Sequence, residues 1–187
     1  MLFAADGRGM VYILSQGSSL DQMAVIGVLP TPTNILSICS GFFLSAHDMG
    51  RMMDTPIAKE ARPSPSATDP PCQVLLAGKN GQVYVLADFN IYPWFKTDFD
   101  IASIVRFRPS TLSPDQPDLV ICAGKSSTVA VYHKGELVSE IHAQDWPRCM
   151  TIGDLDEVGK DMLVLGHHDH TIEVFSYDIA NSPDMQT

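Results

Sequence analysis

The sequence predicts an all-β protein built from one β-hairpin that is repeated four times. Each copy consists of a short apolar run, a turn of small or polar residues, and a second run in which apolar side chains alternate with other types. The copies occupy residues 2–14, 74–88, 119–134 and 162–177. Gly78, Gly124 and Gly166 end the first strand of three copies, at intervals of 46 and 42 residues. An interval of that length holds four strands and matches the ~40–50-residue period of β-propeller blades.

The turn residues between the paired runs are those that tight hairpins require. Asp6-Gly7 and Asn80-Gly81 supply the positive φ of a short connection between antiparallel strands. The first run of each copy is apolar almost throughout, as in a strand that is covered on both faces. No stretch sustains an apolar pattern at the helical period, which favours an all-β chain.

Further strands fall on both sides of the hairpins, where a four-stranded blade requires them. Candidate inner strands precede three hairpins, at residues 35–43, 101–107 and 148–153. Candidate outer strands follow three hairpins, at residues 23–29, 92–96 and 136–142. The total is fourteen strands; the first unit lacks its inner strand and the last lacks its outer strand.

The predicted blades span residues 1–180 and match WD40-like blades in length. Propellers close with ~4–8 blades, so about four blades are at the lower limit. We expect part of a larger or incomplete ring, because Met1 abuts a strand midway through a blade. A closed four-bladed ring and a ring assembled from two partial rings on separate chains are the alternatives.

A segment rich in proline and serine interrupts the second unit. Residues 45–71 contain five prolines, with Ser, Ala and Thr between them. Such a composition buries too little apolar surface to order itself. We therefore expect a flexible loop between the inner strand and the hairpin, and a short tail over residues 181–187.

Composition and charge exclude several classes of function. The chain has 187 residues, of which 45% are hydrophobic and 18% charged, and this balance suits a packed core. Its net charge is −10 and its 12 basic residues are scattered, so we expect no nucleic-acid partner. No run approaches the ~18 apolar residues of a membrane span, and the first residues do not form a secretion signal. Four cysteines without a C-x-x-C pair favour a reduced, cytoplasmic compartment.

The stretch from Asp154 to Gly166 resembles the FG-GAP, or integrin-α-type, repeat, in which Asp-x-Asp-x-Asp-Gly precedes a strand of Leu and Val that ends in Gly. Within that family the chain is most similar to the intracellular propellers of the KICSTOR complex and of the BBSome, where a Gly-x-x-Asp-x-x-Ile-x-Val-Phe stretch resembles residues 166–175. The resemblance implies a non-enzymatic protein-interaction scaffold whose partners are other protein subunits. KICSTOR-like regulation of TORC1 nutrient signalling at the lysosome is the first expectation. A BBSome-like ciliary trafficking coat subunit is the alternative.

The same resemblance implies a candidate calcium site at Asp154, Asp156 and Asp161. FG-GAP loops of adhesion receptors bind calcium, which takes six or more oxygen ligands. Here Val158 and Met162 stand where two further ligands are expected. The competing interpretation, which we favour, is an Asp-rich turn whose carboxylates cap backbone N–H groups. A calcium-stabilised adhesion-type propeller therefore ranks below the scaffold, and no other cofactor is expected.

An aromatic cluster on the second outer strand is the candidate interaction site. Tyr92, Trp94 and Phe95 belong to the residue types that anchor protein interfaces, although core packing between blades explains them as well. Residues 167–170, His-His-Asp-His, include zinc-ligand types, but they fall in the fourth hairpin's turn, where solvated polar residues are normal. No catalytic residue is predicted, because the chain has neither a complete phosphate-binding loop nor a Gly-x-Ser-x-Gly elbow.

Overall fold

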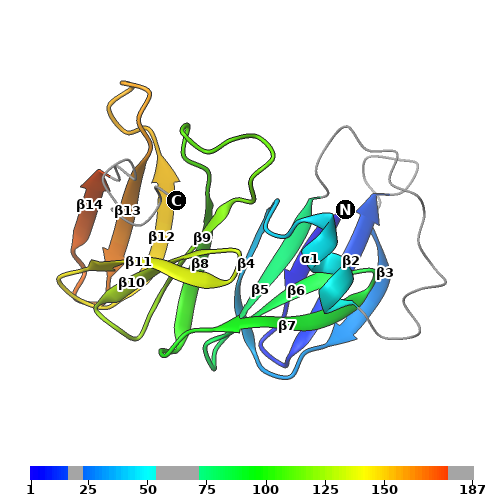
Figure 1. Ribbon diagram of the computed structural model, residues 1–187. Helices are drawn as coiled ribbons and strands as arrows, with labels where there is room; N and C mark the ends of the chain where they lie inside the picture. The colour runs from blue at the N-terminus through cyan, green and yellow to red at the C-terminus, as the bar shows by residue number, and fades with distance from the viewer. Residues whose placement is uncertain (17–22, 54–71, 177–187) are drawn as a thin grey trace.

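The computed structural model of the protein describes residues 1–16, 23–53 and 72–176. These residues form fourteen strands and one helix, and the strands make four antiparallel sheets that follow one another along the chain (Figure 1). Sheet 1 contains β1 (Leu2–Ala5), β2 (Met10–Gln16) and β3 (Met23–Pro30). Sheet 2 contains β4 (Ile35–Gly41), β5 (Gln73–Gly78), β6 (Gln82–Ala87) and β7 (Asn90–Lys96). Sheet 3 contains β8 (Ile101–Phe107), β9 (Leu119–Gly124), β10 (Thr128–His133) and β11 (Glu136–His142). Sheet 4 contains β12 (Pro147–Gly153), β13 (Met162–His167) and β14 (Ile172–Ser176).

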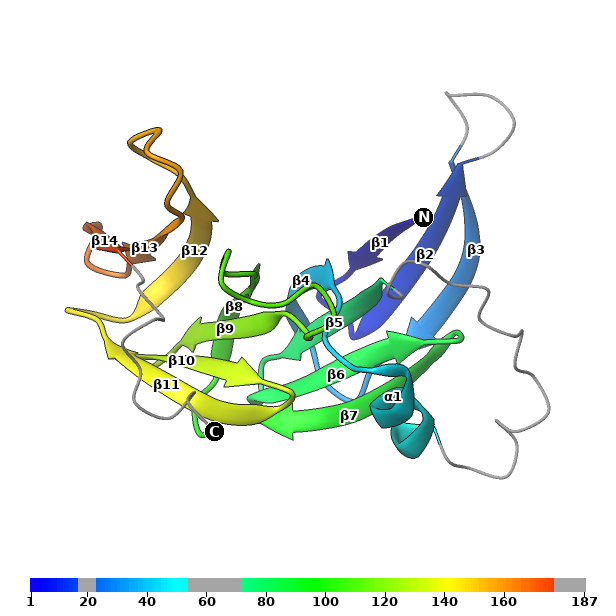
Figure 2. The same cartoon turned by 45° about the horizontal axis from the view of Figure 1, so that its top comes forward.

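The four sheets are arranged in an arc, each packed against the next (Figure 2). Among the first strands of sheets 2, 3 and 4, β8 contacts both β4 and β12. Sheets 2 and 3 have four strands; among the described residues, sheet 1 has no inner strand and sheet 4 has no outer strand. Radially stacked antiparallel sheets of this kind confirm the prediction of an all-β propeller.

Each space between neighbouring sheets is filled by one apolar cluster. Strands β5 and β9 are buried at every residue, because their alternate side chains enter the two adjacent clusters. Leu75, for example, belongs to the cluster between sheets 2 and 3, and Leu76 to the cluster between sheets 1 and 2. Burying such a side chain contributes about 1.5–3 kcal/mol. The stability of each sheet therefore depends on its neighbours.

The first two hairpin turns use positive φ angles, with one difference from the sequence prediction. Gly81 has φ +83°, as predicted, but in the first hairpin the positive φ (+82°) falls on Gly9 and not on Gly7. The reason lies in Asp6, whose carboxylate accepts hydrogen bonds from the N–H groups of Arg8 (2.9 Å) and Met10 (3.0 Å). Those bonds form an Asx turn around Gly7, and the positive φ of the hairpin falls two residues later, at Gly9.

Two buried polar side chains secure the connections between strands. Gln73 is 5% exposed; its Oε1 accepts hydrogen bonds from the backbone N–H groups of Phe43 and Leu44, both at 2.8 Å, and its Nε2 donates to the Leu44 carbonyl at 2.7 Å. Asp118 is 1% exposed and stands directly before β9. Both side chains accept hydrogen bonds from backbone N–H groups of the segment that follows β4.

Helix α1 (Ala46–Met52) lies at the start of the stretch that the sequence predicted to be flexible. Ser45 caps it, because its hydroxyl accepts a hydrogen bond from the backbone N–H of Asp48 at 3.1 Å. Met49 and Met52 pack against the cluster between sheets 2 and 3, and this contact holds the short helix in place. Residues 54–71, the remainder of the predicted insert, and the predicted tail at 181–187 lie outside the described residues.

Candidate interaction groove

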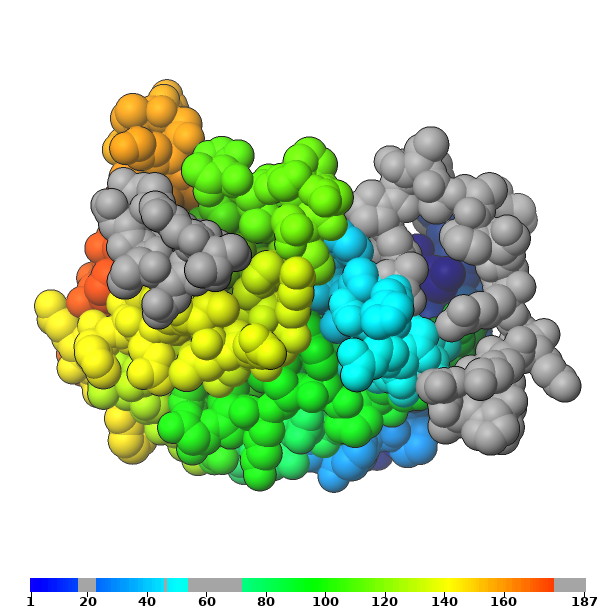
Figure 3. Space-filling model, in the orientation of Figure 1, coloured from blue at the N-terminus to red at the C-terminus, as the bar shows by residue number. Residues whose placement is uncertain are grey.

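An open groove of about 760 Å³ lies between α1 and the β10–β11 hairpin of sheet 3. Figure 3 shows α1 (cyan) and the outer strand of sheet 3 (yellow) on the same face of the molecule. The groove is lined by Leu44, Asp48, Arg51, Met52, Trp94, His133, Lys134, Glu136 and Val138. Its walls thus come from sheet 2, from the helix that follows β4, and from sheet 3.

Aromatic packing across two sheets supports Trp94, which lines the groove. The Phe95 ring stacks on Tyr132 of β10, with ring centroids 4.3 Å apart, and Trp94 meets Phe95 edge-on at 4.9 Å. The turn from β10 to β11 passes over the Trp94 indole: a Cβ on Gly135 would lie 2.8 Å from Trp94 Nε1, and the φ of Gly135 is +84°. Only glycine meets both conditions at that position.

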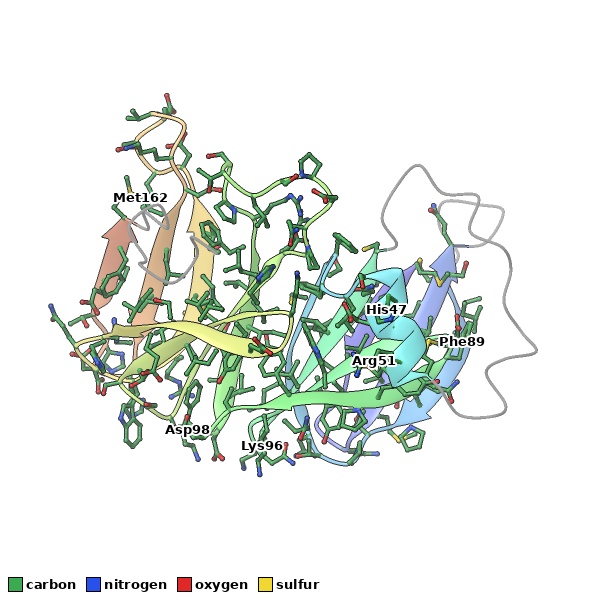
Figure 4. The ribbon with its side chains drawn as sticks, in the orientation of Figure 1. His47, Arg51, Phe89, Lys96, Asp98 and Met162 are labelled. Atoms are coloured by element: carbon green, nitrogen blue, oxygen red, sulfur yellow. The ribbon has the colours of Figure 1, made fainter. Side chains whose placement is uncertain are left out.

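Charged side chains of both signs also line the groove. Arg51 and Asp48 come from α1, and Lys134 and Glu136 from the opposite hairpin (Figure 4 labels Arg51). The Ser45 hydroxyl donates to the Asp48 carboxylate at 2.6 Å and is the main reason why the pKa of Asp48 is lowered, with smaller contributions from His47 and the charge of Lys134. Asp48 is therefore ionised at neutral pH. The groove offers both charges to a bound molecule.

His133 lies in the wall of the groove and is half-buried. Burial, followed by the charge of Lys134, lowers the pKa of His133, so the imidazole is neutral at pH 7. Its buried Nε2 has no hydrogen-bond partner among the described residues. An unsatisfied polar atom of this kind is uncommon in native proteins.

The three predicted interaction residues lie in three different environments. Phe95 is 8% exposed and belongs to the core between sheets 2 and 3. Trp94 packs against that core and lines the groove, and Tyr92 is half-buried on β7 outside it. Sequence reasoning missed α1 and the charged residues opposite it. The pattern Ser45-x-x-Asp48 is a capping-box signature that could have revealed the helix.

The loop between β12 and β13 contains the candidate calcium residues. The Asp154 carboxylate accepts hydrogen bonds from the backbone N–H groups of Gly159 (2.7 Å) and Val158 (3.2 Å), and Asp156 accepts one from Val158 at 3.4 Å. The bond from Gly159 is the largest cause of the lowered pKa of Asp154. No group of three His, Cys, Asp or Glu side chains in the described ranges is placed to hold a metal ion. These residues, with Asp161 exposed at the end of the loop, do not fit a calcium ion.

We predict that neither millimolar calcium nor a chelator changes the melting temperature of the protein. The physical reason is that backbone N–H groups already occupy the carboxylate oxygens that an ion would need. Differential scanning fluorimetry with and without calcium measures this, because an ion that binds only the native state raises the midpoint. A calcium-dependent rise that the substitution Asp154→Asn abolishes would contradict the prediction.

His167 differs from its predicted place in a solvated turn. It ends strand β13 and its side chain is fully buried, while His168, Asp169 and His170 are exposed. The Nδ1 atom of His167 lies 2.9 Å from the carbonyl oxygen of Asp145, and its Nε2 lies 3.1 Å from the Glu173 carboxylate on β14. The repeat pattern predicts that the strand ends at Gly166, but β13 extends one residue further, to His167.

Radial antiparallel sheets of this kind define the chain as part of a β-propeller. Its fold is similar to that of two solved structures, both crystal structures of BBS1N in complex with ARL6DN. The structure soaked with lead aligns with a TM-score of 0.61 at 15% identity, over 92% of this chain and 45% of that one. The structure soaked with mercury aligns with a TM-score of 0.62 at 12% identity, over 96% of this chain and 48% of that one. The chain thus spans about half the length of these propellers, and the likeness concerns the fold.

Sequence comparisons add no assignment. No protein-family model matches the chain, and no curated protein sequence does. Within the described ranges, no helix is long and apolar enough to cross a lipid bilayer.

Proposed function

We propose that the chain is a non-enzymatic, protein-interaction propeller of the BBSome-like kind, and that the groove between α1 and the β10–β11 hairpin is its docking site. The observation that carries the proposal is the fold shared with BBS1N, which was crystallised in complex with another protein, ARL6DN. This fold favours the BBSome-like alternative over KICSTOR-like regulation of TORC1, for which no finding gives support. The KICSTOR-like function and a place at the lysosome stay predictions.

The chemistry of the groove supports a protein partner. A Trp side chain in the lining of a cleft, together with charged groups, is a common anchor arrangement in protein interfaces. Trp94 and Met52 offer apolar contact, and Arg51 and Glu136 offer charges of opposite sign on opposite walls. A partner segment that places one apolar side chain between an acidic and a basic residue would complement this surface.

A charge-swap variant tests the groove without altering the net charge. We expect Arg51→Glu combined with Glu136→Lys to reduce the recovery of bound proteins at least about fivefold. Each substituted side chain then repels the charged group of the partner that the original side chain attracted. Both residues are exposed, so the fold should persist. Affinity purification with quantitative mass spectrometry measures recovery, and direct titration with ARL6, the protein bound in the similar structures, is the first specific test.

The matched control is the same swap made elsewhere, Glu157→Lys with Lys160→Glu in the exposed β12–β13 loop. It should bind partners as the wild type does. If folded wild-type protein recovers no partner, the interaction function is refuted. If partners bind equally well to the groove variant, the docking site is elsewhere.

A further inference from the structure

The arc has two end faces, one on sheet 1 and one on sheet 4, that point away from the neighbouring sheet (Figure 2). On sheet 4 the outward residues include Ile172 and Val174, which are 75% and 47% exposed. On sheet 1 they include Leu2 and Val28, which are 56% and 44% exposed. Large exposed apolar faces on a propeller blade are interaction surfaces.

The end face of sheet 4 repeats a face that is buried elsewhere in the protein. The strand register shows which residues of sheets 3 and 4 correspond. Pro147 pairs with His167 in sheet 4 at the position where Ile101 pairs with Gly124 in sheet 3. The outward residues of sheet 4 therefore correspond to residues of sheet 3 that are buried against sheet 4. Met162, Val164, Ile172 and Val174 correspond to Leu119, Ile121, Val129 and Val131. Met162 is labelled in Figure 4.

The end face of sheet 1 corresponds to the face of sheet 2 that is buried against sheet 1. Leu2 pairs with Leu14, and Ala4 with Tyr12, as Val74 pairs with Leu86, and Leu76 with Tyr84, in sheet 2. Those four residues of sheet 2 are all buried in the cluster against sheet 1. The outward face of sheet 1 thus carries the residue types that a preceding blade covers.

The two end faces are the two halves of one blade-to-blade interface. At every interface inside the protein, two faces meet. One is the face of a sheet that looks toward the next sheet along the chain, as the end face of sheet 4 does. The other is the face of that next sheet that looks back, as the end face of sheet 1 does. Sheet 4 of one chain therefore fits sheet 1 of another. The outward side chains compared above carry no charge, so the net charge of −10 is not concentrated where the faces would meet.

We propose that a second copy of this chain covers both end faces, head to tail, and closes the ring. One chain aligns with 45–48% of the BBS1N chains, so two copies match about one such propeller in length. Two copies supply twice four sheets, and eight lies within the ~4–8 blades of closed propellers. A head-to-tail contact repeated twice closes with two-fold symmetry when the arc covers half a turn.

Sedimentation equilibrium of the whole chain at micromolar concentrations tests the proposal. We expect twice the chain mass of 20.4 kDa. Val174→Lys on sheet 4 and Val28→Lys on sheet 1 should each weaken association on the order of 100-fold, because each buries an unpaired charge in the interface. Leu137→Lys is the matched control: Leu137 is 51% exposed on β11, away from both end faces, and its variant should associate as the wild type does.

Mixing the two end-face variants separates this arrangement from a dimer that forms through two like faces. The mixture should regain a weaker dimer, because one of its two interfaces contains no lysine. Loss of association in only one of the two variants would indicate a contact between like faces and would overturn the proposal. A folded wild-type monomer, with the circular dichroism of a β-protein, would overturn it too, and would mean that other blades cover these faces. Polymers larger than two chains would also refute closure.

Discussion

Replacing Gly124 by alanine is expected to destabilise the protein by about 3 kcal/mol or more, since overpacking against backbone cannot be relieved by a side-chain rotation. A Cβ at this position would lie 1.9 Å from the carbonyl oxygen of Asp100 and 2.9 Å from the backbone nitrogen of Ala102. The segment that leads into β8 crosses Gly124 this closely because Lys125 N–H donates to the Asp100 carbonyl at 2.9 Å. The methyl group would have to push β8 away from β9, its neighbour within sheet 3, beside the interface with sheet 2.

Urea unfolding followed by circular dichroism measures this change. Gly153→Ala, at the end of β12, is the matched control, because a Cβ there has nothing within 4 Å. Its stability should lie within about 1 kcal/mol of the wild type, on the stabilising side, because alanine restricts the unfolded chain. Equal stability of the two variants would show that the segment before β8 moves away freely.

The second large effect is expected at Asp118. Its Oδ2 accepts hydrogen bonds from the Phe42 N–H and from Arg106 Nε, both at 2.8 Å, and its Oδ1 lies 2.6 Å from Arg108 Nη1. Asp118→Ala leaves a backbone N–H without its acceptor and two guanidinium groups without their counter-ion. Because the arginine side chains are 47% and 26% exposed, water compensates them in part, and we expect a loss of about 3 kcal/mol.

Thermal and urea unfolding of Asp118→Ala and Asp118→Asn separate the two contributions. The asparagine variant keeps an acceptor for the Phe42 N–H and loses only the charge, so its loss should be smaller. Asp115→Ala is the control within the same loop, since the Asp115 carboxylate is exposed and is hydrogen-bonded only locally, by the Ser113 hydroxyl. A stability loss at Asp115 as large as that at Asp118 would contradict the assignment.

The candidate groove followed from the sequence only in part. Trp94 was singled out as an aromatic anchor, and the structure places it in a groove, but the opposite wall consists of Asp48 and Arg51 on a helix that the apolar pattern did not reveal. A helix of only seven residues has too few apolar positions to show a period. Phe95 was grouped with Trp94 because they are adjacent in sequence. In a strand, adjacent side chains point to opposite faces, and Phe95 fills the core against Tyr132.

By itself, the sequence determined the fourteen strands of the described residues and their pairing into four hairpins. It also predicted that, among those residues, the first sheet has no inner strand and the last has no outer strand. These features depend on local alternation and on turn residues, and both are encoded within a few neighbouring positions. Only the tertiary structure decided where the groove lies, that His167 is buried, and that Asp118 joins two sheets. Each of these depends on residues far apart in the chain, such as Phe42 and Asp118, whose proximity is set by how neighbouring sheets pack.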